Sequence, residues 1–77
     1  MSKNVLIDVR TTEEYQCGHM PNSINIPLAA ITHIVNHVPD KNMSISVYCK
    51  SGARATQAKS ILESMGYTNV TNIGGFN

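Results

Sequence analysis

Cys49 is the residue whose surroundings most clearly indicate chemistry. It ends an apolar segment, Ser44 to Tyr48, that predicts a strand, and a helix-forming segment from Ala55 to Met65 follows a few residues later. Backbone amides converge at a helix N-terminus, where the positive end of the helix dipole favours an anion. The segment between strand and helix consists of Lys50, Ser51, Gly52, Ala53 and Arg54. We therefore predict that Cys49 is a thiolate nucleophile and that this loop binds anions.

The loop residues suggest separate roles. Gly52 allows a sharp turn that directs backbone N–H groups inward. Lys50 is expected at the mouth of the site, facing solvent and attracting anions. Arg54 either binds an incoming oxyanion or folds back to brace the loop. Because the loop contains no obvious general base, its electrostatics must produce the thiolate.

Size and composition narrow the class of protein. The chain has 77 residues, 42% hydrophobic and 14% charged, which predicts one small globular domain over residues 1–77. A net charge of +1 gives no reason to expect nucleic acid or an anionic membrane as a partner. Two cysteines make neither a disulfide framework nor a zinc site, and no run approaches ~20 apolar residues. We expect no metal and no cofactor.

The N-terminal residues bear on the compartment. Met1 to Asn4 pass into an apolar segment too quickly to hold a signal peptide. The chain as it stands therefore predicts a cytoplasmic protein, or a periplasmic one if a signal peptide was removed.

Hydrophobic periodicity and turn residues predict alternating strands and helices. The expected strands are Val5–Val9, Ser23–Ile26, Ile45–Tyr48 and Asn69–Ile73, and the expected helices are Thr11–Cys17, Leu28–Val38 and Ala55–Met65. Such alternation is typical of an α/β fold, here a three-layer α/β/α arrangement with a small parallel sheet. The near-continuous apolar run of the first strand predicts that it is covered on both faces.

Sites in parallel sheets lie beyond the carboxyl ends of the strands. Asp8, Arg10, Cys49 and an expected turn at Gly74–Gly75 all fall at that edge. We predict that Arg10 pairs with Glu14 as a brace between strand and helix. Asp8 is expected to support the active loop.

The remaining reactive side chains favour structural interpretations. Cys17 has no cation beside it and is predicted to be a passive thiol, although a disulfide with Cys49 would depend on their separation. His19 precedes a strand, where a histidine more often ties backbone groups together than acts as a base. His33 and His37 are four residues apart without a third ligand, so we interpret both as surface residues.

Four motifs in order carry a family resemblance. They are Leu6–Arg10 with Glu13-Glu14-Tyr15, the segment Gly18–Pro27, Val47–Cys49 with Ser51-Gly52 and Arg54, and Gly66-Tyr67 with Gly74–Phe76. Together they resemble a single-domain rhodanese of the short phage-shock-protein E type. The chain departs from the family pattern by lacking an opening strand and helix and by having Asn22-Ser23 in place of Gly-Ala.

The resemblance implies a sulfurtransferase with a persulfide on Cys49. Thiosulfate or a similar anionic donor would supply the sulfur, and cyanide, a thiol or a protein would accept it. A basic Lys50 suits dianionic thiosulfate, and inward amides suit the negative terminal sulfur. We expect a monomer.

Two other functions are compatible with parts of the pattern. Cysteine-dependent phosphatases and arsenate reductases use C-x₅-R, but Arg54 follows Cys49 after four residues, so the loop is one residue shorter than a tetrahedral oxyanion needs. A non-enzymatic rhodanese-like module for sulfur relay or binding is the second alternative. Its partner would supply the chemistry.

Overall fold

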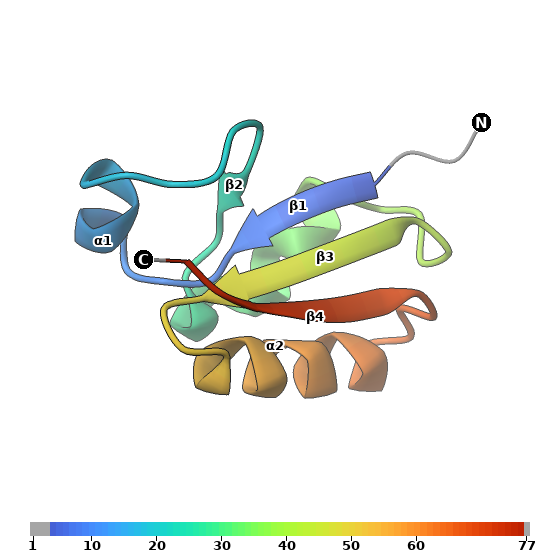
Figure 1. Ribbon diagram of the computed structural model, residues 1–77. Coiled ribbons are helices and arrows are strands. Elements are labelled where there is room, and N and C mark those ends of the chain that lie inside the picture. Colours follow the sequence, from blue (N-terminus) through green and yellow to red (C-terminus); the bar gives the residue numbers. More distant parts are fainter. Residues whose placement is uncertain (1–3, 77) are drawn as a thin grey trace.

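The computed structural model describes residues 4–76 and has the expected alternation of elements (Figure 1). The strands are β1 (Asn4–Asp8), β2 (Ile24–Asn25), β3 (Ser44–Cys49) and β4 (Val70–Gly75). The helices are α1 (Thr12–Gln16), the 3₁₀ helix η1 (Leu28–Asn36) and α2 (Ala53–Ser64). All strand pairs are parallel, in the order β2-β1-β3-β4. The predicted α/β class and parallel sheet are confirmed. Within the described range no helix is long and apolar enough to span a membrane.

One face of the sheet carries the hydrophobic core. Strands β1 and β3 pair Ile7 with Val47, and both side chains are fully buried. They pack in one cluster with residues of both long helices, namely Ile31 and Ile34 of η1 and Ala55, Ala58 and Leu62 of α2. The two alanines leave room for α2 to lie close to the sheet. The core therefore fixes the start of α2 relative to the end of β3, where Cys49 lies.

The other face is covered only over the carboxyl ends of β1 and β3. On this face Leu6 and Ser46, earlier in the same strands, are only half-buried, and Ile73 of β4 is 45% exposed. Tyr48 on the same face is fully buried because the α1–β2 connection crosses it, with the Met20 amide donating to the Tyr48 hydroxyl at 3.0 Å. The prediction that β1 is covered on both faces is therefore wrong for its first half, and the third layer is short.

The segment predicted as a helix from Leu28 is a kinked 3₁₀ helix. Its backbone leaves helical geometry at Ala30, with φ −115° and ψ 15°. A 3₁₀ helix has three residues per turn, so Ile31 and Ile34 lie on the same side and are buried. Val35, expected on the apolar face, is 39% exposed for the same reason.

Helix α1 lies beyond the arrowhead of β1 (Figure 1). It begins with the predicted capping box: the Glu14 amide donates to Thr11 Oγ1 at 3.2 Å, and the Thr11 amide donates to Glu14 Oε1 at 3.0 Å. The helix buries no residue of its own. Its position therefore depends on polar contacts with the rest of the site.

Candidate active site

The thiol of Cys49 lies where β3 ends and α2 begins. Gly52 is the N-cap of α2 and has a left-handed backbone, φ 97°. Its amide donates to Cys49 Sγ at 2.9 Å, and the Ala55 amide donates at 3.4 Å. The first amides of a helix have no partner within it. Here they converge on one sulfur atom.

The electrostatics of this amide cradle favour the thiolate. Cys49 has no solvent exposure, and burial by itself would raise the pKa of its thiol. Backbone hydrogen bonds outweigh that effect, so the pKa of Cys49 lies below its ordinary value. The amides concerned are those of Ala55, Ser51, Gly52 and Arg54. Full burial is also typical of structural cysteines, but a structural thiol does not need several amides directed at its sulfur.

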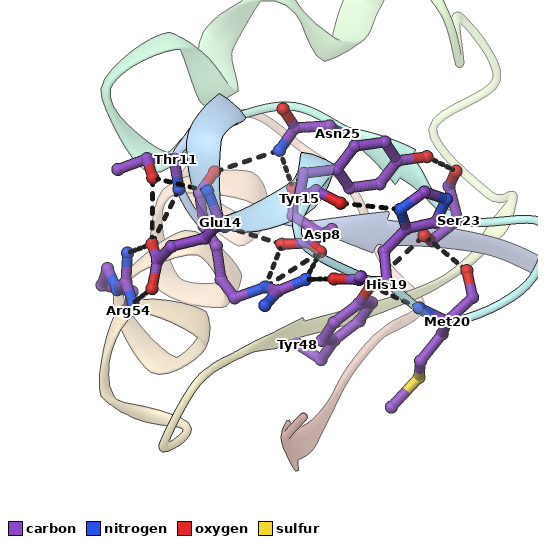
Figure 2. A network of polar contacts seen from close by, with 12 residues as sticks. Asp8, Thr11, Glu14, Tyr15, His19, Met20, Ser23, Asn25, Tyr48 and Arg54 are labelled. Carbon is purple, nitrogen blue, oxygen red and sulfur yellow. Dashed lines mark hydrogen bonds and ion pairs between the residues drawn. The ribbon is translucent and has the colours of Figure 1, made fainter. Parts of the chain in front are cut away.

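Arg54 folds back from the cradle to helix α1. Its Nη1 lies 2.7 Å from Glu14 Oε1 and its Nη2 lies 3.1 Å from Glu14 Oε2. Figure 2 shows the two side chains facing each other. The hydrogen bonds from Arg54 hold the pKa of Glu14 at about 2. Arg54 was expected either to bind an oxyanion or to fold back as a brace, and in the structure it folds back. The same contact ties α1 to the active loop.

Arg10 does not pair with Glu14, and that prediction is wrong. Its Nε lies 3.0 Å from each carboxylate oxygen of Asp8, and its Nη2 donates to Asp8 Oδ2 at 2.7 Å and to the Gly18 carbonyl at 2.6 Å. The chain turns directly after β1, where the Arg10 amide donates to Asp8 Oδ1 at 2.9 Å, so the two side chains meet locally. Burial opposes ionisation of Asp8, but the hydrogen bonds from Arg10 hold its pKa below the usual value.

The Asp8 carboxylate contacts Arg10. In the described part of the chain, no hydrogen bond joins its carboxylate to residues 49–54. Instead it fixes Arg10, whose guanidinium carbon lies 5.1 Å from the centre of the Phe76 ring and 5.7 Å from that of Tyr48. Arg10 and Phe76 both line the cleft beside the loop, so the Asp8–Arg10 pair lies against one wall of the cleft.

Gly74 and Gly75 end strand β4 and do not form the expected turn. Gly75 pairs with Cys49 across an irregularity in the β3–β4 register. A Cβ atom at Gly75 would overlap the Lys50 carbonyl oxygen and lie 2.9 Å from its carbonyl carbon. The Phe76 amide then donates to the Cys49 carbonyl at 2.8 Å. Glycine is needed here because the backbone of β4 lies directly against the active loop.

A cleft of about 400 Å³ opens beside the loop. It is lined by Arg10, Glu13, Glu14, Cys17, Gly18, Lys50 and Phe76. Lys50 is exposed at this cleft, as predicted for a residue at the mouth of the site. Ser51 and Ala53 are exposed on the loop, and the Ser51 amide is one of those that lower the pKa of Cys49.

Comparisons with known proteins agree with this geometry. The family model described as rhodanese-like domain matches residues 1–77. The thiosulfate sulfurtransferase PspE of Escherichia coli K12 is 51% identical over 70 residues, which cover 90% of this chain and 67% of PspE.

The chain belongs to the rhodanese-like family.

Further relatives fit that assignment. A sulfurtransferase of Allochromatium vinosum is 35% identical, over 92% of this chain and 65% of that protein. The chain thus spans about two thirds of the length of these two relatives. A solved structure described as a rhodanese with anions from E. coli has a TM-score of 0.91 and 49% identity, covering 95% of this chain and 87% of that one. The prediction of a rhodanese-type sulfurtransferase is confirmed at the level of the family.

The other reactive residues of this rhodanese-like domain lie outside the cradle. Cys17 is an exposed free thiol in the wall of the cleft. His19 Nδ1 lies 2.8 Å from the Tyr15 carbonyl oxygen and its ring stacks on Tyr15, in agreement with the structural interpretation. His33 on η1 and His37, the residue that caps its C-terminus, are both exposed. No cluster of three or more metal-ligating side chains occurs within residues 4–76.

Sequence reasoning did not assign the observed contacts of four residues at the site. The Ala55 amide could have been found, because it belongs to the first turn of the predicted helix. Glu14 was identified, but with Arg10 as the wrong partner. Gly75 was expected at this edge of the sheet but as part of a turn, and Phe76 was noted only within a motif, because their contacts depend on the approach of β4 to the loop.

Proposed function

We propose that this rhodanese-like domain transfers sulfane sulfur from thiosulfate to a nucleophilic acceptor through a persulfide on Cys49. The observation that carries the proposal is the amide cradle, in which Gly52 and Ala55 donate to Cys49 Sγ. A thiolate that is stabilised without a neighbouring base matches a reaction that transfers sulfur and no proton.

The donor half-reaction is a displacement at sulfur. The Cys49 thiolate attacks the outer sulfur of thiosulfate, a new S–S bond forms, and the donor's own S–S bond breaks with its electron pair leaving on sulfite. The charge before and after the step is the same. Lys50, exposed beside the nucleophile, attracts the dianionic donor.

The acceptor half-reaction restores the enzyme. Cyanide or a thiolate attacks the outer sulfur of the persulfide, and the Cys49 thiolate leaves. Amides that stabilise a negative sulfur serve both steps, because the persulfide and the leaving thiolate are both anionic at this site.

A cysteine-dependent phosphatase needs an arginine that binds the oxyanion, and Arg54 is paired elsewhere. Both terminal guanidinium nitrogens of Arg54 donate to the Glu14 carboxylate instead. Hydrolysis of an aryl phosphate without sulfur transfer would contradict the sulfurtransferase proposal and favour the phosphatase alternative.

Intact mass spectrometry tests the proposal directly. After thiosulfate treatment the protein should gain one sulfur atom, and cyanide should remove it with formation of thiocyanate. The Cys17→Ser variant should behave in the same way, whereas Cys49→Ser should gain nothing. Sulfur bound to the Cys49→Ser protein, or none on the wild type, would contradict the proposal.

A further inference from the structure

The cleft beside the active loop is larger than the donor requires. Its volume of about 400 Å³ lies within the range of about 300–1,000 Å³ that is usual for small organic ligands. Two of its lining residues adjoin the nucleophile: Lys50 follows Cys49 in the chain, and Phe76 donates its amide to the Cys49 carbonyl. The cleft therefore adjoins the active loop beside the residue that would carry the persulfide, whereas the Cys49 side chain itself is fully buried and does not line it.

Two of the four charged residues in the cleft are already neutralised. Arg10 lies 2.7 Å from Asp8, and Glu14 lies 2.7 Å from Arg54. Lys50 and Glu13 remain, and within residues 4–76 neither side chain has an ion pair or a hydrogen bond. They are opposite in sign, so the cleft presents one free cation and one free anion.

The rest of the lining is uncharged. It comprises the Phe76 ring, Cys17 and Gly18. A ligand suited to this cleft has a short uncharged body with a carboxylate and an ammonium group. A thiol that carries only a carboxylate could pair with Lys50 but not with Glu13.

We propose that the cleft selects a zwitterionic aminothiol as the sulfur acceptor, with its carboxylate at Lys50 and its ammonium at Glu13. This inference rests on the proposed persulfide on Cys49. The acceptor thiolate attacks the outer sulfur, which moves to the acceptor as a new persulfide while the electron pair of the broken S–S bond returns to Cys49. Two negative charges enter the step and two leave it.

Single-turnover transfer from the isolated Cys49 persulfide tests the proposal. The probes are L-cysteine, 3-mercaptopropionate, which lacks the ammonium, and cysteamine, which lacks the carboxylate. Each variant is compared with the wild type for the same probe at equal thiolate concentration, so the differing reactivity of the probes cancels. Because the donor step is complete beforehand, only acceptor recognition is measured.

Glu13→Gln should slow transfer to L-cysteine and cysteamine about two- to fivefold, the range for one exposed charge contact, without slowing transfer to 3-mercaptopropionate. Lys50→Gln should slow transfer to L-cysteine and 3-mercaptopropionate but not to cysteamine. Glu63→Gln is the matched control, because this exposed carboxylate lies on α2 and is no part of the cleft lining. It should change none of the three rates.

The outcomes separate this inference from the function on which it rests. If the persulfide forms but Glu13→Gln alters the three rates equally, or alters none, the acceptor assignment is wrong and the sulfurtransferase proposal stands. If thiosulfate leaves no sulfur on Cys49, the proposed function itself fails. The selective effects should also weaken at 1 M salt, where the screening length falls to about 3 Å.

Discussion

The amide nitrogen of Gly52 lies 2.9 Å from Cys49 Sγ, and the left-handed backbone of Gly52 directs it there. One glycine thus begins helix α2 and completes the anion site. An added Cβ at Gly52 would make only ordinary contacts, 3.7 Å from Gly74 Cα. The requirement for glycine at this position is therefore conformational.

Gly52→Ala should destabilise the protein by ~1–2 kcal/mol, the cost of a left-handed non-glycine residue. It should also raise the pKa of Cys49, because the amide would turn away from the sulfur. In the wild type, thiolate reactivity should persist to lower pH than in the urea-unfolded chain and should fall as pH drops through the lowered pKa. The pH dependence of iodoacetamide reaction at Cys49, in a Cys17→Ser background, measures the pKa of Cys49 in the variant, in the wild type and in the unfolded chain.

Gly66→Ala is the matched control for this prediction. Gly66 has a similar φ of 101°, with nothing within 4 Å of an added Cβ, and follows the far end of α2. Its substitution should lower stability by a similar amount while the Cys49 profile stays unchanged. Identical profiles for the Gly52 and Gly66 variants would show that the Gly52 amide does not stabilise the thiolate.

The Arg54–Glu14 pair should make the free energy of unfolding depend on pH. Glu14 has a pKa of about 2 in the folded protein and an ordinary value of 4.5. Its contribution to the free energy of unfolding is therefore complete above pH 4.5 and is lost as the pH falls towards about 2. A double-mutant cycle of Glu14→Gln and Arg54→Met, followed by urea unfolding across this range, should show coupling that declines over that window. Coupling that stays constant down to pH 2 would contradict the assignment.

The Asp8–Arg10 pair should be essential for folding stability. Asp8→Asn leaves a guanidinium that is almost fully buried without its anion, and breaking such a pair costs ~3–5 kcal/mol. The double variant Asp8→Asn, Arg10→Met should lose less stability than the sum of the single variants, because it leaves no buried charge. Urea unfolding measures all three, and additive losses would show that the two residues act independently.

Gly75→Ala tests the close approach of β4 to the active loop. The new methyl group would overlap the Lys50 carbonyl, so the loop must shift, at a cost of ~1–3 kcal/mol. Persulfide formation should slow because the cradle moves with the loop.

Gly74→Ala provides the comparison, since an added Cβ there meets nothing within 4 Å and only its left-handed backbone, φ 97°, is strained. Its stability should fall by ~1–2 kcal/mol, with a smaller loss of sulfur transfer than in Gly75→Ala. Equal transfer rates in the two variants would rule out steric contact as the reason for glycine at position 75.

Local patterns in the sequence were sufficient to predict the place of Cys49 between a strand and a helix and to predict most of the elements. Cys49 at the junction of an apolar strand and a helix, and the Thr11–Glu14 capping box, depend on neighbours within a few residues. Such interactions are encoded by spacing alone. The 3₁₀ geometry of η1 was not predicted, because the apolar spacing of that segment also suits an α-helix.

The tertiary structure decided which charges pair and what surrounds the thiol. Arg54 and Glu14 are 40 residues apart, and only the packing of α2 against the parallel sheet brings the start of that helix to α1. The burial of Cys49 and the contact of Gly75 with Lys50 likewise require β4 to lie beside β3. Residue types determined which chemistry was available, whereas partners distant in the chain were selected by the free energy of packing the whole core.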